Sequence, residues 1–208
     1  MTTVVVMAKE PRPGRVKTRL CPPCTPQEAA RLAAAALADT LAAVEAASCA
    51  RRLLAFDGCA GDWHRPGWDL VAQVDGELGQ RLGAAATAVD GPVLLVGMDT
   101  PQLSGALLDH ACERLAEPGI DAVLGPADDG GYWAVGFHRP VEGAFDEVPM
   151  STAATGRHQR ARLDALGLRV GALPRLRDVD TFADARAVAA LIPHSGFAHA
   201  VHDTLAAR

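Results

Sequence analysis

A single carboxylate, Asp99, directly follows the apolar run at residues 93–96. An unbroken apolar run is typical of a strand buried on both faces, and open α/β sheets bind ligands beyond the carboxyl ends of such strands. Pro101 restrains the chain just after the acid. Asp99 is therefore a candidate metal ligand. The alternative is that it only caps the helix expected to begin near Ser104.

A basic segment follows the first expected strand, at residues 3–7. Within eleven residues it carries five cations, and Gly14 with two prolines restrains its backbone; the cations are Lys9, Arg12, Arg15, Lys17 and Arg19. Clustered Lys and Arg side chains are suited to binding phosphates. A solvated basic loop is the alternative, and it is the usual role of a charge run. If the strands are parallel, this segment lies at the same sheet edge as Asp99, which favours a phosphate site.

Two acids and two glycines stand between the strand expected at residues 121–125 and an aromatic strand; they are Asp128, Asp129, Gly130 and Gly131. The glycines permit a tight turn, and the acids could face a polar ligand. Asp128 or Asp129 is therefore a candidate general base. A hairpin-like turn stabilised by the same acids is the alternative, and the pattern leaves both open.

The elements that would position these groups alternate between strands and helices. Further strands are expected at residues 52–56, 70–74 and 168–173, and helices at 25–47, 104–117, 151–166 and 181–191, with another ending near Val89. Thr25, Pro26 and Glu28 form a capping signature for the first helix. This alternation predicts a single three-layer α/β/α domain over residues 1–208 with a mostly parallel sheet. The tail at 193–208 is expected to be a peripheral surface helix or a partly ordered end.

The composition excludes several classes of protein. The net charge of -5 and the 49% of hydrophobic residues describe a soluble globular protein without a nucleic-acid surface. No apolar run approaches the ~18 residues needed to span a membrane, so a cytoplasmic location is the default expectation. Cys21 and Cys24 have the spacing of zinc and redox pairs. We favour an incidental pair because Cys49, Cys59 and Cys112 offer no second pair of ligands.

Four segments, in order, resemble a bacterial family of GT-A-type glycosyltransferase-like proteins in the nucleotide-diphospho-sugar transferase superfamily. They are residues 8–20, 97–103, 128–132 and 178–181, so the resemblance covers nearly the whole chain. The first segment is also similar to that of the phospholactate guanylyltransferases, which share the fold. The resemblance implies a Rossmann-like nucleotide-binding half and a mixed sheet, with a nucleotide and a divalent cation above the strand ends.

The resemblance also implies roles for individual residues. Asp99 and Asp180 would bind the metal, and oxygen ligands of this kind suit Mg²⁺ or Mn²⁺. The basic segment would hold the nucleotide through Lys9, Gly14, Arg15, Lys17 and Arg19, with Lys17 also acting in catalysis on the departing phosphate. Gly130 and Gly131 would let the substrate approach the backbone. The related sequences often carry Trp where this chain has Met150, before a Ser151 that could cap the next helix.

Three functions follow from this reading. The first is metal-dependent glycosyl transfer from a nucleoside-diphosphate sugar to an acceptor hydroxyl. The second is guanylyltransferase-like nucleotidyl transfer to a small phosphorylated substrate, for which residues 17–20 are the best argument. The third is a nucleotide-binding module without turnover, against which Asp99, Asp180 and the basic segment all stand. The nucleotide base, the sugar, the acceptor, the stereochemistry and the oligomeric state stay open.

Overall fold

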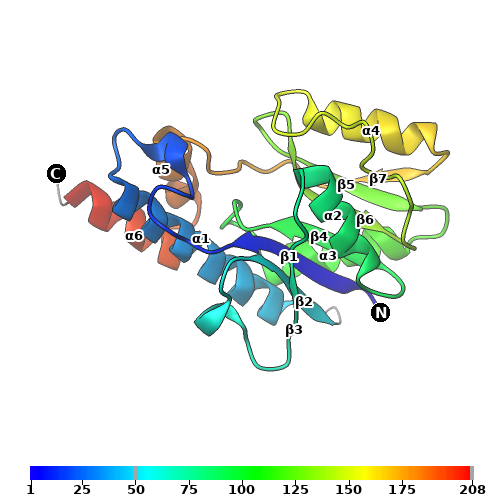
Figure 1. Ribbon diagram of the computed structural model, residues 1–208, viewed down its shortest axis with the longest axis horizontal. Coiled ribbons are helices and arrows are strands. Elements are labelled where there is room, and N and C mark those ends of the chain that lie inside the picture. The colour runs from blue at the N-terminus through cyan, green and yellow to red at the C-terminus, as the bar shows by residue number, and fades with distance from the viewer. Residues whose placement is uncertain (49–50, 207–208) are drawn as a thin grey trace.

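A seven-stranded sheet with the order β3-β2-β1-β4-β6-β5-β7 organises the chain (Figure 1). The computed structural model describes residues 1–48 and 51–206, so Cys49 and the last two residues of the predicted tail lie outside the described part. The strands are β1 (Thr3–Lys9), β2 (Arg52–Asp57), β3 (Asp69–Ala72), β4 (Val93–Gly97), β5 (Ala122–Pro126), β6 (Tyr132–Phe137) and β7 (Val170–Ala172).

Six of the seven strands run in the same direction. Strand β6 is antiparallel to both of its neighbours, β4 and β5, whereas all the other ladders are parallel. The reversal arises because a tight turn, too short for a crossover, joins β5 to β6. The mostly parallel mixed sheet predicted from the sequence is confirmed. Its parallel strands all end at one edge, and the candidate site residues follow those ends.

Helices cover both faces of the sheet and complete three layers. One face packs against α1 (Pro26–Ala46) and α3 (Gly105–Ala116), and the other against α2 (Leu78–Thr87) and α4 (Thr155–Ala165). The centre of the sheet is apolar on both faces: Val4 and Val6 pack toward α1, and Val5 and Met7 toward α2. This alternation follows from the two-residue period of a strand.

The first helix continues beyond the sheet, where α5 (Phe182–Leu191) and α6 (Gly196–Ala206) pack against it. Figure 1 shows these three helices together at one end of the molecule. The capping box of Thr25 and Glu28 at the start of α1 is present as predicted. Of the two expectations for the tail, a surface helix is found, and it buries Phe197 and Val201 against α1 and α5.

One predicted boundary is wrong. Helix α4 begins at Thr155 rather than at Ser151, and its N-cap, Ala154, provides no side-chain cap. Ser151 has a left-handed backbone with φ of 59°, so it cannot cap the helix as expected. The Thr155 hydroxyl instead donates to the carbonyl of Pro149, which holds residues 149–155 in an irregular loop. Within the described residues, no helix combines the length and the apolar character that crossing a membrane requires.

Candidate functional site

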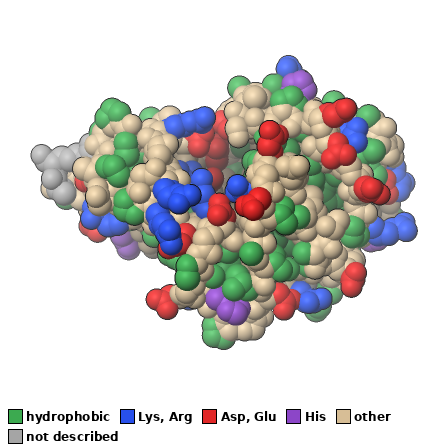
Figure 2. Space-filling view, in the orientation of Figure 1, with side chains coloured by type: hydrophobic (Ala, Val, Ile, Leu, Met, Phe, Trp, Pro, Cys, Tyr) green, Lys and Arg blue, Asp and Glu red, His purple; other side chains and the backbone are tan. Residues whose placement is uncertain are grey.

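A cavity of about 620 Å³ opens at the edge where β1, β4 and β5 end. Charged side chains line its mouth: Arg19, Asp99, Asp129, Asp178 and Asp180. Figure 2 shows acidic and basic side chains around a hollow near the centre of this face. The predicted convergence of the basic segment, the end of β4 and the β5–β6 turn on one place is therefore observed.

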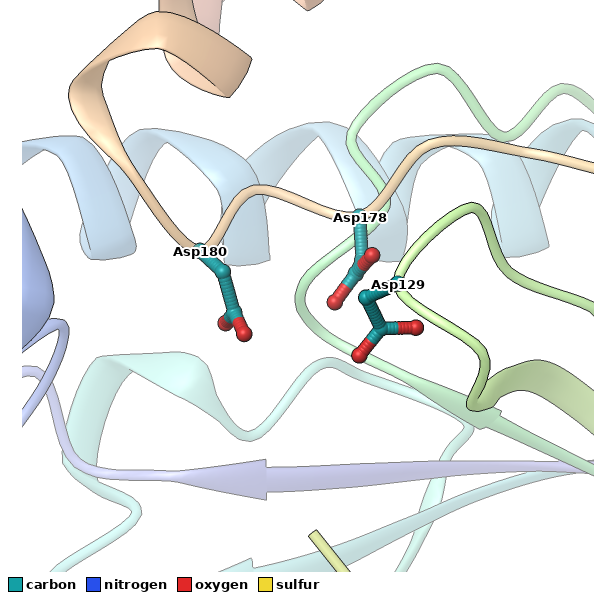
Figure 3. A group of neighbouring side chains, drawn as sticks. All are labelled: Asp129, Asp178 and Asp180. Carbon is teal, nitrogen blue, oxygen red and sulfur yellow. The ribbon is translucent and has the colours of Figure 1, made fainter. Parts of the chain in front are cut away.

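Three carboxylates form the acidic part of this mouth. Asp129, Asp178 and Asp180 each offer an oxygen atom that lies within 4.8 Å of the other two. Figure 3 shows the three side chains directed into the same space, Asp129 from the β5–β6 turn and the other two from the link that precedes α5. Burial, and then the charges of Asp129 and Asp180, raise the pKa of Asp178 to about 6. Crowded carboxylates of this kind favour a bound cation or a proton.

The link that carries two of these acids is anchored to the sheet. Val179, between them, is buried among α1, α5 and α6, and its amide donates to the carbonyl of Asp99 over 2.9 Å. In an extended segment, side chains two residues apart lie on the same side. Burial of Val179 on one side therefore turns Asp178 and Asp180 toward the cavity on the other.

Lys17 connects the basic segment to the acids. Its Nζ atom lies 2.7 Å from Oδ1 of Asp99 and 4.0 Å from Oδ1 of Asp180, and it donates to the carbonyl of Val179. Only 9% of the Lys17 side chain is exposed, against 51% for Asp99. Arg19 adds a second cation, 2.8 Å from Oδ2 of Asp180. A positive charge thus faces the acids from the phosphate-binding side expected from the sequence.

The structure separates the two candidate bases. Asp129 lines the cavity, and its Oδ1 accepts a hydrogen bond from the amide of Gly131 over 2.7 Å. The Asp129 side chain therefore stabilises the turn and also faces the space in which a ligand would bind. Asp128 lies in a neighbouring groove, 3.3 Å from the Arg177 guanidinium, and does not line the cavity. Only Asp129 of the pair therefore reaches the cavity.

The two glycines of the same turn also differ. Gly131 lines the cavity, as the sequence suggests. Gly130 has φ of 90°, and a Cβ atom there would lie 2.0 Å from the carbonyl oxygen of Ala153. Its missing side chain thus makes room for the protein's own backbone rather than for a substrate.

The remaining residues of the basic segment are spread over two smaller hollows. Lys9 and Lys17, with Arg19, line a hollow of about 170 Å³ that shares Asp99 and Asp180 with the main cavity. Arg15 lines another, of about 280 Å³, together with Lys9, Arg12 and Arg81. Gly14 lines neither; it has φ of 75° in an exposed turn, with open space around it. The cations of the basic segment are therefore divided between two hollows, and in the second of them Arg12 is paired with Glu10 and Arg81 with Asp57.

Sequence reasoning missed several residues of the cavity. Asp178 lies in residues 178–181, a segment that resembles the family, but no role was predicted for it. Its spacing of two residues from Asp180 in an extended link nevertheless indicates that both side chains lie on the same side of the chain. Thr100 also lines the cavity, and among the described residues its buried hydroxyl has no hydrogen-bond partner. The apolar wall beyond the acids has no local sequence signal; it comprises Met7, Leu78, Leu82, Leu95, Tyr132, Val135 and Met150.

The cysteine pair lies away from this chemistry. Cys21 and Cys24 are not joined by a disulfide, and both pack with the cluster formed by α1, α5 and α6. In the part of the chain that the structure describes, the grouping with metal-ligand geometry consists of the three aspartates alone.

Comparisons with known proteins support the assignment of the fold. The family model described as "Uncharacterized protein conserved in bacteria (DUF2064)" matches residues 40–152, more than half of the chain. No protein of curated function matches. A solved structure from Desulfovibrio desulfuricans G20, provisionally assigned as a nucleotide-diphospho-sugar transferase, is 26% identical with a TM-score of 0.89. The match covers 99% of this chain and 95% of the chain in that structure.

Two more distant structures share the fold. Rv0371c from Mycobacterium tuberculosis H37Rv, solved in complex with manganese, is 22% identical with a TM-score of 0.58; the match covers 90% of this chain and 97% of that one. A CMP:2-keto-3-deoxy-manno-octonic acid synthetase complexed with CTP is 14% identical with a TM-score of 0.60, over 92% of this chain and 98% of that one. The predicted nucleotide-diphospho-sugar transferase fold is confirmed.

Proposed function

Because the chain belongs to the DUF2064 family and has the nucleotide-diphospho-sugar transferase fold, we propose that it is a metal-dependent transferase using a nucleotide-activated donor. The reaction we favour is glycosyl transfer from a nucleoside-diphosphate sugar to an acceptor hydroxyl. The observation that carries this proposal is the cluster of carboxylates beside Lys17 and Arg19 at the mouth of one cavity.

A divalent cation fits the donor set at this mouth. The acids supply only oxygen ligands, which suit Mg²⁺ or Mn²⁺. When all are ionised, Asp99, Asp129, Asp178 and Asp180 with the two cations leave a charge of about -2, which one divalent ion balances. Asp129, Asp178 and Asp180 together have the geometry of a cation site, and we assign Asp178 and Asp180 as ligands because Asp129 is given another role below. Asp99, the ligand predicted from the sequence with Asp180, remains a candidate, although its Oδ1 is engaged by Lys17.

A bound cation would supply a positive charge that stabilises the departing diphosphate. The chain's own contribution to this step comes from the basic segment. Lys17 and Arg19 lie beside the acids, and Lys9 and Arg15 extend the positive surface away from them. A diphosphate bound between the cation and the pair Lys17 and Arg19 would be neutralised from both sides, and the charge that develops on it would meet donors that are already in place.

Asp129 is the residue we propose as general base. Its Oδ1 is held by the Gly131 amide, so the carboxylate is oriented while it faces the cavity. In the proposed reaction the acceptor oxygen forms a bond to the anomeric carbon, and the bond from that carbon to the diphosphate breaks with its electron pair. The hydroxyl proton passes to Asp129.

Nucleotidyl transfer is the second candidate, and the hollow around Lys9, Arg12, Arg15 and Arg81 favours it. Arg12 and Arg81 are paired there with Glu10 and Asp57, and Lys9 and Arg15 could accept the additional charge of a triphosphate. In this reaction a substrate phosphate would attack the α-phosphorus and pyrophosphate would leave.

Released products distinguish the two reactions. The metal-free protein is incubated with Mn²⁺, a mixture of small alcohols and small phosphorylated compounds as acceptors, and either nucleoside-diphosphate sugars or nucleoside triphosphates, and thermal stability and products are recorded. A ligand at ~100 times its dissociation constant adds about 2.7 kcal/mol of stability. We expect Mn²⁺-dependent stabilisation by a nucleotide sugar and release of a nucleoside diphosphate. Pyrophosphate release from a triphosphate would establish the second candidate, and stabilisation by no nucleotide would refute both.

A further inference from the structure

The main cavity has two chemically different parts. Its carboxylates come from loops at the edge of the sheet, whereas Met7, Leu95 and Val135 lie within the strands and face α2. Leu82 from α2 and Met150 from the loop before α4 close this second part. The cavity thus extends from a charged mouth to an apolar wall, and its volume of about 620 Å³ lies in the range of small-molecule sites.

The apolar part offers no positive charge to a ligand. Among the residues that line the cavity, Arg19 is the one cation, and it is already paired with Asp180 at the mouth. The Tyr132 hydroxyl is bonded to Gln159, and that of Thr155 to the carbonyl of Pro149. A phosphate or carboxylate group of a ligand in this part would have no cation as a partner and would lie near four carboxylates of the protein. Its burial there would carry a large desolvation cost.

A sugar is also poorly matched to the apolar wall. Each sugar hydroxyl loses its water on entering the cavity and needs a hydrogen-bond partner there. Ser151 and Thr100 are the lining hydroxyls for which the described contacts show no partner. A molecule with a largely apolar body that places one alcohol hydroxyl near the carboxylates satisfies both parts of the cavity, because burial of apolar surface is favourable.

We propose that the apolar part of the cavity is the acceptor subsite, and that it takes an uncharged alcohol with a largely apolar body. This inference rests on the proposed glycosyl transfer and specifies its acceptor. The alcohol enters with its hydroxyl toward Asp129, and its body contacts Leu78, Leu82 and Met150. The phosphates of the donor bind beside the basic segment, so the charged donor and the uncharged acceptor occupy different parts of the site.

Tyrosol and its phenyl phosphate ester provide a matched pair of probes, because both keep the aliphatic alcohol and differ by one charged group. Binding of each to the protein is measured without donor, and transfer is then measured with nucleotide sugar and Mn²⁺. We expect tyrosol to bind at least about tenfold more tightly than its phosphate ester and to be the better acceptor. Equal or tighter binding of the phosphate ester would overturn the proposal.

Leu78→Arg tests the position of the subsite. Leu78 is the first residue of α2, is 43% exposed and lines the cavity, so a cation there is tolerated by the fold. The variant should lose about tenfold in tyrosol affinity and gain affinity for the phosphate ester. Leu191→Arg, at a leucine that is 69% exposed and lies outside the cavity, is the control and should leave both affinities unchanged. Unaltered discrimination in Leu78→Arg would place the subsite elsewhere and overturn the proposal.

Nucleotide binding is followed separately, so the two proposals can fail independently. If a nucleotide sugar binds with Mn²⁺ but the phosphate ester is the preferred acceptor, the acceptor assignment is overturned and the proposed function stands. If tyrosol binds while no nucleotide does, the transferase assignment fails, and the acceptor role falls with it.

Discussion

At the scale of single residues, the site depends on carboxylates held closer together than their charges favour. Asp178 is the clearest case, because burial and two neighbouring acids raise its pKa to about 6. The folded protein therefore retains this proton to higher pH than the unfolded chain does. Stability of the metal-free protein should fall as pH rises from about 4 to about 6, and then level off.

Asp178→Asn removes this charge while keeping the shape of the side chain. We expect the variant to have a higher melting temperature than the wild type at pH 7.5 in the presence of a chelator, and little difference near pH 4. Thermal unfolding at the two pH values measures the effect. Asp62→Asn, an exposed acid in the short 3-10 helix at Gly61–Trp63, serves as the control and should change neither value. An equal shift at both pH values would contradict the account.

The sequence predicts which segments carry the site but not which side chain of each segment faces it. Asp128 and Asp129 are indistinguishable as neighbours in a turn, and the fold decides between them by pairing Asp128 with Arg177, a residue 49 positions away. Lys17 was expected to meet phosphates. Its contact with Asp99 reaches the end of β4, and its contact with Val179 reaches a link 162 residues later in the chain; no local pattern reveals either contact.

At the scale of elements, the β5–β6 turn positions Asp129 and Gly131. Gly130 occupies a left-handed conformation and lies against residues 153–156, and its carbonyl accepts from the amide of Gly156 over 2.8 Å. The turn and the loop before α4 therefore support each other. The alternative reading of residues 126–131 as a hairpin turn describes the backbone correctly, and the same turn also brings one acid to the cavity.

Gly130→Ala should destabilise the protein by at least about 2 kcal/mol. The added Cβ atom imposes backbone strain and would overlap the Ala153 carbonyl, so the turn has to move. Gly167→Ala is the matched control, since Gly167 has φ of 75° but open space around it. It should cost only about 1 kcal/mol, from strain alone. Chemical denaturation measures both, and equal losses would show that the contact with Ala153 contributes nothing.

Boundaries of elements followed from local signals where capping chemistry was explicit. Thr25 and Glu28 fixed the start of α1, and Thr181 and Asp184 fix that of α5 in the same way. The start of α4 was misplaced because Ser151 satisfies the composition of a cap without its backbone conformation. At that boundary the Thr155 hydroxyl accepts from the amide of Thr152 and donates to the carbonyl of Pro149, a local arrangement without a recognised capping signature in the sequence.

At the scale of the whole molecule, the cluster formed by α1, α5 and α6 packs against the segments that carry the site. Leu20, which follows the basic segment, and Val179, between two site acids, are both buried in the cluster of α1, α5 and α6. Phe197 of α6 is a large side chain at the same place and is 1% exposed. The C-terminal helix thus takes part in positioning two walls of the mouth, although it contributes no residue to the cavity lining.

Phe197→Ala should lower the free energy of unfolding by about 3–5 kcal/mol, because it leaves a cavity in this cluster. Leu205→Ala, on the same helix but 39% exposed, should cost much less. Urea denaturation of the three proteins provides the comparison. If the two variants lost the same stability, α6 would not be packed as described.

The architecture was accessible from the sequence because its strands and helices are strongly patterned and alternate regularly. For the tail, the sequence left a surface helix and a partly ordered end both open, because the helix is stabilised by the surface that α1 and α5 supply for Phe197. The cavity's apolar wall was likewise hidden, as Met7, Leu82 and Met150 come from three distant elements and look like ordinary core residues in the sequence.

The measurement that tests the central claim most directly is calorimetric titration of a nucleoside-diphosphate sugar into the chelator-treated protein, with and without Mn²⁺. Wild type, Asp180→Asn and Asp99→Asn are compared, with Asp62→Asn as the control. We predict binding that requires Mn²⁺, is weakened at least about tenfold in Asp180→Asn, and is unchanged in Asp62→Asn. A similar loss in Asp99→Asn would make Asp99 a ligand as well. Binding that is independent of Mn²⁺ and unaffected in Asp180→Asn would contradict the account.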